Sequence, residues 1–228
     1  MKRFYTMATV TGTGPFGVAL DGRPVRTPAR AALAVPTQRL AAAMAGEWNG
    51  QGAQVLPRTM PLTGLANAAI DRVVPDAPGF ADGLARFAEN ELLAYRADEP
   101  PALVARQAAA WDPWLAWARQ RYDIDFALVT GIIHRAQPPA TLAQLTAAFR
   151  AFDAFSLAAL NPVVTISGSA VIGLAVAEAV MDADEAWVVG HLDELWQAEQ
   201  WGKDPLAEAG HRERQADLAT AVDFLRLL

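Results

Sequence analysis

The spacing of hydrophobic positions predicts strands at the start of the chain. Residues 4–10 are rich in aromatic, β-branched and threonine residues, which is typical of a strand. Residues 16–20 and 23–26 flank Asp21-Gly22 and predict a hairpin, because an Asp-Gly pair readily adopts the positive φ angles of a tight turn. Residues 31–35 predict a third short strand.

Beyond these strands the spacing becomes helical and remains so to the C-terminus. Thr37 is placed to cap the first helix, which carries Leu40 and Trp48 on one face. Helices are predicted over residues 37–49, 62–73, 81–96, 101–122, 142–160, 169–181, 184–201 and 205–227. We therefore expect an α+β protein with a small, β-rich N-terminal α+β domain over residues 1–75. A larger orthogonal α-helical bundle domain is expected over residues 80–228.

One uncharged stretch, residues 155–177, is long enough to raise the question of a membrane span. Asn161-Pro162 interrupts this stretch, small polar residues lie in its middle, and Glu178 follows it directly. It also lacks the flanking basic cluster that a membrane helix would be expected to have. We therefore expect a buried core helix over residues 169–181 and no contact with a membrane.

Composition and charge exclude several classes of protein. Hydrophobic residues make up 53% and charged residues 19% of the 228 residues, as in an ordinary globular protein. The formal net charge of -6 argues against nonspecific binding to nucleic acid or to an anionic membrane. The absence of cysteine excludes disulfides, thiolate metal sites and cysteine nucleophiles. The N-terminus resembles neither a secretory signal nor a transit peptide, so we expect either a bacterial cytoplasm or a chain from which such a segment has been trimmed.

Residues able to carry catalysis or hold a cofactor do not form a recognised site. Residues 12–17 have the spelling G-x-G-x-x-G, but a strand follows them where a dinucleotide site needs a helix. We interpret them as a glycine-rich turn. His134, His191 and His211 are the only histidines, and their spacing is not that of metal ligands. No cofactor and no metal are expected.

The helix predicted over residues 184–201 is the most informative segment. Val188, Leu192 and Leu195 lie on its apolar stripe, and the next position on that stripe is Glu199. A carboxylate at a core position must be paired, partly hydrated or neutral. Glu199 is therefore either a glutamate at the rim of the core that pairs with an arginine, or a functional carboxylate in a groove.

Acidic and aromatic residues are interleaved in the same helix. Asp193, Glu194 and Glu199 alternate with Trp196 and Trp201. Acidic groups around aromatic anchors suit the recognition of a basic or amphipathic protein segment. These five residues form the predicted partner-binding site.

Short motifs are spread in a characteristic order along nearly the whole chain. They are VALDGRPVRTP (residues 18–28), LAVPT (33–37), Glu47-Trp48, TMPLT (59–63), Ala69-Ile70-Asp71, ELLAYR (91–96), Gln107, Trp111-Asp112-Pro113, Gly168-Ser169, Leu192-Asp193-Glu194 and WQAEQWG (196–202). Each motif alone is weakly specific. Their order and spacing together resemble the ATP12 family of F1-ATPase assembly chaperones.

The resemblance implies a chaperone that binds the free α subunit of F1-ATPase and prevents its aggregation until the β subunit replaces it. It implies no catalysis and no cofactor. Eukaryotic members act in the mitochondrial matrix and alphaproteobacterial members in the cytoplasm. The essential glutamate of the family corresponds by motif position to Glu199, with Glu194 as the second choice. Asp204-Pro205 follows where a short acidic stretch is expected, and the protein is expected to be a monomer.

Two functions of other kinds are alternatives. A small hydrolase or transferase would need His134 or His191 within hydrogen-bond reach of a carboxylate. A general protein-binding module would bind clients without turnover and without preference among them. Arg23 and Arg26 could contact a partner or pin the hairpin by pairing with acids of the helical domain. We expect the structural role, because Asp-Gly and Pro in such a motif commonly serve backbone geometry.

Overall fold

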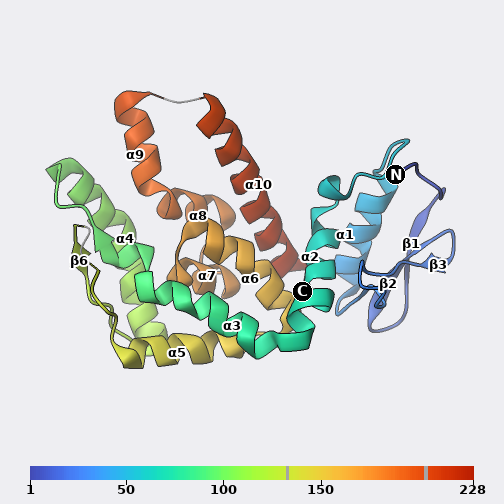
Figure 1. Ribbon diagram of the computed structural model, residues 1–228, viewed down its shortest axis with the longest axis horizontal. Coiled ribbons are helices and arrows are strands. Elements are labelled where there is room, and N and C mark those ends of the chain that lie inside the picture. The colour runs from blue at the N-terminus through green and yellow to red at the C-terminus, as the bar shows by residue number, and fades with distance from the viewer. Residues whose placement is uncertain (132–133, 203–204) are drawn as a thin grey trace. The chain divides into compact units, whose positions relative to one another are not determined.

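The computed structural model describes residues 1–131, 134–202 and 205–228. Its strands are β1 (Ala8–Thr11), β2 (Phe16–Leu20), β3 (Arg23–Pro24), β4 (Ala34–Val35), β5 (Tyr95–Arg96) and β6 (Val129–Thr130). Its α-helices are α1 (Gln38–Asn49), α2 (Pro61–Ala68), α3 (Ala77–Ala85), α4 (Pro101–Tyr122), α5 (Pro139–Arg150), α6 (Ala154–Ser167), α7 (Ala170–Ala177), α8 (Ala183–Gly190), α9 (Leu192–Trp201) and α10 (Pro205–Leu227). Short 3-10 or π-helical turns are η1 (Pro57–Thr59), η2 (Ala69–Val73), η3 (Val74–Asp76), η4 (Arg86–Asn90) and η5 (Leu92–Ala94). A small N-terminal sheet region followed by helices confirms the predicted α+β class (Figure 1).

The chain groups into two compact units. The first comprises Met1–Ala77, Asp153–Ala159 and Thr220–Leu228, and the second comprises Pro78–Phe152 and Leu160–Ala219. The boundary after Ala77 falls between the two expected domains, but parts of α6 and α10 also belong to the first unit. A division into independently folding domains over residues 1–75 and 80–228 stays a prediction.

The sheet of the first unit is organised around β2. Strand β1 pairs antiparallel with β2, with Ala8 opposite Leu20, and both β3 and β4 also pair with β2. Asp21 and Gly22 have φ angles of 47° and 81°, as the predicted hairpin turn requires. The first strand begins at Ala8 and not at Phe4, because the N–H groups of Thr6 and Met7 donate to the Asp21 carboxylate and not to a neighbouring strand.

Helix α1 supplies much of the core of the first unit. Thr37 caps it as predicted, since its Oγ1 accepts a hydrogen bond from the Leu40 N–H at 3.2 Å. Leu40, Met44 and Trp48 are buried on one face of the helix. They join the apolar residues of the sheet and Phe224 of α10 in one hydrophobic cluster.

Several predicted helices are divided in the structure, whereas α4 and α10 match their predicted ranges. The helix predicted over residues 81–96 ends at Ala85 and continues as the turns η4 and η5. The stretch 142–160 divides into α5 and α6, and the Asp153 carboxylate accepts the Phe155 N–H at 2.8 Å. The stretch 184–201 divides into α8 and α9.

Helix α7 is the buried core helix expected in the uncharged stretch, although it is shorter than predicted. Its residues from Ala170 to Val176 are all buried. Gly168, with a φ angle of 71°, separates it from α6, so the uncharged stretch does not form one continuous helix. Within the described residues, no helix combines the length and apolar character needed to cross a membrane.

A buried carboxylate, that of Glu91, holds the N-terminus of α7. Glu91 is 0% exposed. Its Oε2 accepts hydrogen bonds from the N–H groups of Ala170 (2.9 Å) and Val171 (3.3 Å), and its Oε1 accepts one from Leu93 (3.3 Å). The first N–H groups of a helix have no partner within the helix. Glu91 therefore satisfies donors that are shielded from water. Burial raises the pKa of Glu91 to about 7, although the Ser169 hydroxyl and these N–H groups oppose the shift.

We predict that Glu91 makes the stability of the protein depend on pH. Because its pKa is higher in the folded state than the ordinary 4.5, its contribution is present below about pH 4.5 and lost as the pH rises through about 7. In urea unfolding, the free energy of unfolding of wild type minus that of Glu91→Gln should fall by about 2 kcal/mol between pH 5 and pH 7.5. The exposed neighbour Glu89→Gln is the matched control. Parallel profiles for wild type and Glu91→Gln would contradict the prediction.

Candidate partner-binding site

Helix α9 carries all five residues of the predicted partner-binding site. It begins after His191 and ends at Gly202, whose φ angle is 87° and whose N–H donates to the Ala198 carbonyl at 3.0 Å. Asp193 and Glu194 lie in the first turn, where negative charge is favoured by the helix dipole. The structure therefore brings the five residues onto one short helix.

One side of α9 is tied to α4. The Arg106 guanidinium donates two hydrogen bonds to the Glu199 carboxylate, at 2.5 Å and 2.8 Å, and lies 5.6 Å from the ring centre of Trp196. The Gln107 amide donates to Asp193 at 2.8 Å. Of the two interpretations of Glu199, pairing with an arginine is the one observed. These hydrogen bonds from Arg106 lower the pKa of Glu199.

The apolar stripe predicted through Glu199 does not continue from α8 into α9. Val188 is 51% exposed, whereas Leu192 is buried. The helices break at His191, so residues before and after it no longer share one helical phase. Glu199 is an exposed side chain beside α4 and not a member of a continuous core stripe.

Another side of α9 meets α10. One oxygen of Glu194 lies 2.9 Å from the His211 ring nitrogen Nε2 and 3.7 Å from the Arg214 guanidinium. Trp187 of α8 stacks on His191, with ring centres 3.6 Å apart, and meets His211 edge-on at 5.8 Å. His191 is buried, and that burial lowers its pKa.

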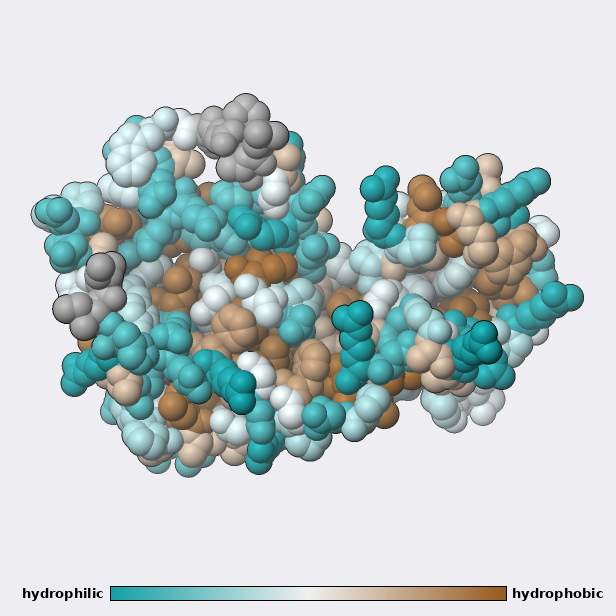
Figure 2. Space-filling model, viewed as in Figure 1, coloured by the Kyte–Doolittle hydropathy of each residue, from teal (hydrophilic) through white to brown (hydrophobic). Residues whose placement is uncertain are grey.

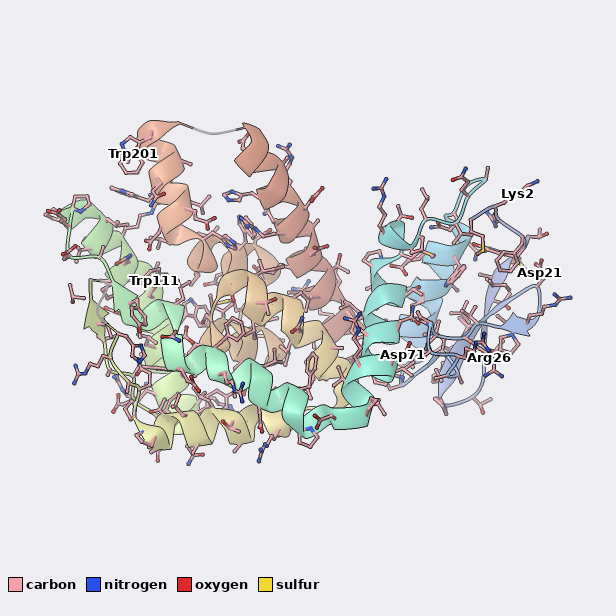
Figure 3. The ribbon with its side chains drawn as sticks, in the orientation of Figure 1. Lys2, Asp21, Arg26, Asp71, Trp111 and Trp201 are labelled. Carbon is pink, nitrogen blue, oxygen red and sulfur yellow. The ribbon has the colours of Figure 1, made fainter. Side chains whose placement is uncertain are left out.

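Trp201 stands at the C-terminal end of α9, where its side chain is 79% exposed (Figure 3). With Trp187, Leu195 and Ala198 it lines a groove of about 490 Å³ between α9 and α10. Polar residues complete the lining, among them Glu194, Gln197, His211, Arg212 and Gln215. On the face seen in Figure 2, hydrophobic residues lie mainly in recesses between polar ones. The groove combines apolar contact area with a polar rim.

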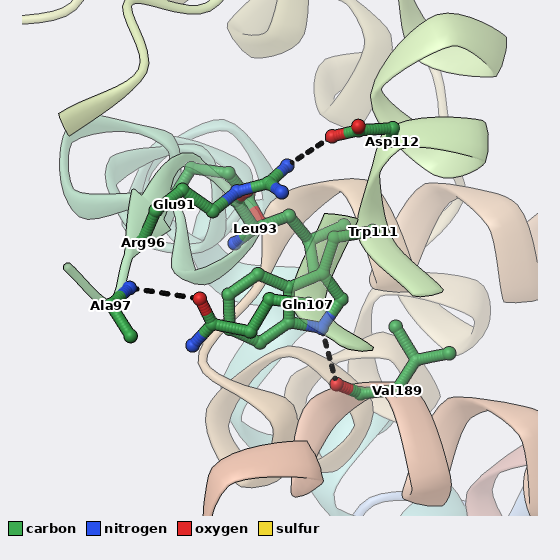
Figure 4. Close-up of polar contacts among 8 residues, drawn as sticks. All are labelled: Glu91, Leu93, Arg96, Ala97, Gln107, Trp111, Asp112 and Val189. Carbon is green, nitrogen blue, oxygen red and sulfur yellow. Dashed lines mark hydrogen bonds and ion pairs between the residues drawn. The ribbon is translucent and has the colours of Figure 1, made fainter. Parts of the chain in front are cut away.

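Buried motif residues from the middle of the chain contact α8 and α9, and Figure 4 shows the contacts of Gln107 with Ala97 and of Trp111 with Val189. The buried Gln107 accepts the Ala97 N–H at 2.8 Å through its amide oxygen, while its amide nitrogen holds Asp193. The indole N–H of buried Trp111 donates to the Val189 carbonyl of α8 at 3.0 Å. Gln107 thus holds α9, and Trp111 holds α8.

Sequence reasoning did not assign Arg106, His211 or Arg214 to this region. Arg106 and Glu199 lie 93 positions apart, so no local spacing could connect them. The one available signal was the motif residue Gln107, which is the neighbour of Arg106 in the sequence. Asp204, expected in an acidic stretch, lies outside the described residues.

Within the described residues, neither His134 nor His191 has the carboxylate neighbour that the hydrolase alternative requires. The His134 ring pairs with the Tyr95 hydroxyl at 3.0 Å and His191 with the Trp187 carbonyl at 3.1 Å. His211, which that alternative did not name, lies 2.9 Å from the Glu194 carboxylate. The described part of the chain holds no group of three side chains able to bind a metal.

Comparison with known proteins confirms the family. The sequence profile of the family described as ATP12 chaperone protein matches residues 2–119. The crystal structure of Atp12 from Paracoccus denitrificans is 39% identical, with a TM-score of 0.95, and the match covers 99% of this chain and 97% of that one. A mutant of the same protein gives 38% identity and a TM-score of 0.94.

A protein from Agrobacterium tumefaciens is similar over 99% of this chain and 85% of its own, with 40% identity and a TM-score of 0.94. The family profile spans more than half of the chain, and the similarity to the solved structures extends over nearly all of it. The resemblance inferred from the motifs is therefore confirmed. The chain belongs to the ATP12 chaperone family.

Proposed function

We propose that this protein is an assembly chaperone that binds the free α subunit of F1-ATPase and prevents its aggregation until the β subunit replaces it. The observation that carries the proposal is the similarity to Atp12 over 99% of the chain. An unassembled subunit exposes the surface that its partner later covers, and a large exposed apolar patch promotes aggregation. In this proposal the protein acts without catalysis, as a monomer in the bacterial cytoplasm.

The contact surface in this proposal is α9 with its groove against α10. A chaperone must release its client, so an apolar centre with a polar rim suits it better than an obligate interface. Trp201 is the natural anchor, because an exposed tryptophan offers a large contact area and tryptophan is enriched among residues that dominate binding energy. Glu194 and its partner His211 lie at the rim of the groove.

Glu199 has a positioning role in this proposal. Both of its carboxylate oxygens already accept hydrogen bonds from Arg106, and Asp193 is likewise held by Gln107. These two contacts, with Trp196 beside the Arg106 guanidinium, fasten α9 to α4. Glu199 would then act on the client through the placement of α9 and Trp201, and not by meeting a cation on the client.

The proposed function predicts selective protection of the isolated α subunit. Light scattering of purified cognate α should fall as this protein is added, with full suppression near a 1:1 molar ratio, and addition of β should release the complex. An acidic protein of similar size serves as the control chaperone, and an unrelated aggregating protein as the control client. Equal protection of both clients would indicate a general binding module. Absence of protection would refute the proposal.

We predict that Trp201→Ser weakens binding of α about tenfold or more, because it removes the exposed anchor. The melting temperature should stay within about 2 °C of wild type, since substitutions of exposed residues usually change stability little. Val188→Ser removes another exposed apolar side chain, on α8 outside the groove, and should leave binding unchanged. Equal affinities of wild type and Trp201→Ser would place the contact elsewhere.

A double-mutant cycle tests the positioning role of Glu199. Glu199→Gln and Arg106→Gln should each weaken α binding several-fold, because each breaks the same ion pair. The double variant should then bind α with about the affinity of the single variant that binds it less tightly. If Glu199 instead meets a cation of the client, Arg106→Gln would leave binding intact or improve it. Arg150→Gln, which breaks the comparable surface pair with Asp82, is the control.

A further inference from the structure

Charge is distributed unequally between the two compact units. The first unit contains nine Lys and Arg against six Asp and Glu, a formal net charge of +3. The second contains ten against nineteen, a formal net charge of -9. The overall charge of -6 therefore conceals a basic unit within an acidic protein.

The carboxylates of the first unit are largely occupied by the backbone of that unit. Four of them accept hydrogen bonds from backbone N–H groups: Asp21 from Thr6 and Met7, Glu47 from Leu62 and Thr63, Asp71 from Ala29, and Asp153 from Phe155 and Ser156. A carboxylate used in this way is less available to an arginine side chain. Except for Arg3, the basic side chains of this unit are exposed.

Four exposed arginines lie on or beside the loop that follows β3: Arg23, Arg26, Arg30 and Arg72. We call them the arginine loop cluster. Within the described residues, none of the four has a carboxylate at ion-pair distance. The expectation that Arg23 and Arg26 pin the hairpin by pairing with acids is therefore not met. The Arg26 guanidinium instead donates a hydrogen bond to the Arg30 carbonyl at 2.9 Å, so it lies beside the backbone of Arg30.

The loop that carries this cluster is held by hydrogen bonds to the Asp71 carboxylate. The Thr27 hydroxyl donates to Asp71 at 2.6 Å, and the same carboxylate accepts the Ala29 N–H at 3.0 Å. Thr27 is buried, and its carbonyl accepts the Arg30 N–H at 2.8 Å. Arg72 follows Asp71 directly in η2 (Asp71 and Arg26 are labelled in Figure 3). The arginines therefore project from a preorganised backbone, which lowers the entropy cost of binding.

Arg30 has a backbone conformation that disfavours its own side chain. Its φ angle of 68° lies in the left-handed region, which is unfavourable for a residue with a Cβ atom and which glycine adopts freely. The chain places a long cation at a position where glycine would be more stable. Strained positions of this kind cluster at functional sites, so the strain supports a use for the Arg30 side chain.

We propose that the arginine loop cluster is a second docking surface, which binds an acidic segment of the client protein. This inference rests on the proposed chaperone function. Planar guanidinium groups that form no ion pair within the protein are suited to carboxylates, which they bind in pairs of hydrogen bonds. Nucleic acid is a weaker candidate, because residues 22–32 contain no aromatic side chain on which a base could stack.

The test measures the affinity of the full-length protein for purified cognate F1 α subunit at 50 mM and 300 mM salt. The variant Arg26→Gln/Arg30→Gly removes two charges and gives residue 30 the residue that its backbone favours, so folding is preserved. We expect about five- to tenfold weaker binding at low salt and a smaller loss of affinity with added salt than in wild type. Arg30→Lys should retain most of the affinity.

Arg58→Gln is the control, because it removes one charge from the same unit at the far end of α2 and η2. Wild-type and double-variant affinities that agree at both salt concentrations would overturn this inference and leave the chaperone proposal standing. Failure of the wild-type protein to bind α would refute the chaperone proposal and this inference with it. The wild-type protein could instead bind phosphatidylserine vesicles or single-stranded DNA more tightly than α. If the double variant lost that binding, the assignment of a protein ligand to the cluster would be overturned.

Discussion

The second unit depends on one buried carboxylate at the start of one buried helix. Helix α7 begins inside the protein, where water cannot satisfy its first N–H groups, and Glu91 accepts two of them. Leaving such donors unpaired costs about 1–3 kcal/mol each. The packing around α7 is also tight, since a Cβ atom at Gly173 would lie 2.4 Å from a methyl carbon of Val164. The helices that pack on α7, including α4 and α8, take their positions from it.

Carboxylates also accept hydrogen bonds from backbone N–H groups in the first unit. Glu47 accepts the N–H groups of Leu62 and Thr63 at the start of α2, and Asp71 holds the loop after β3. Two carboxylates of the sequence motifs thus accept hydrogen bonds from the backbone. Within the described residues, the arginines around that loop have no carboxylate at ion-pair distance, and the unit carries a net positive charge although the chain is acidic.

The candidate site depends on helix α9 and its two neighbours. Arg106 and Gln107 of α4 hold one side of α9, and His211 of α10 contacts the other. Trp201 lies beyond these contacts and remains exposed. In the proposed function the charged residues set the position of the helix, and the tryptophan and the groove supply the contact. Reversible binding of a client needs this combination of a fixed scaffold and a limited apolar surface.

The sequence by itself determined the fold class, the family, the hairpin at Asp21-Gly22 and the helices α1, α4 and α10, because these depend on local periodicity, turn chemistry and motif order. It also brought the five residues of α9 together. Only the tertiary structure decided where the other helices break and what Glu199 does. Glu91 meets α7 across 79 positions and Arg106 meets Glu199 across 93, and contacts of that range leave no mark on the local pattern. The charge asymmetry, in contrast, is carried by the sequence itself, since Met1–Ala77 alone contains eight Lys and Arg against four Asp and Glu.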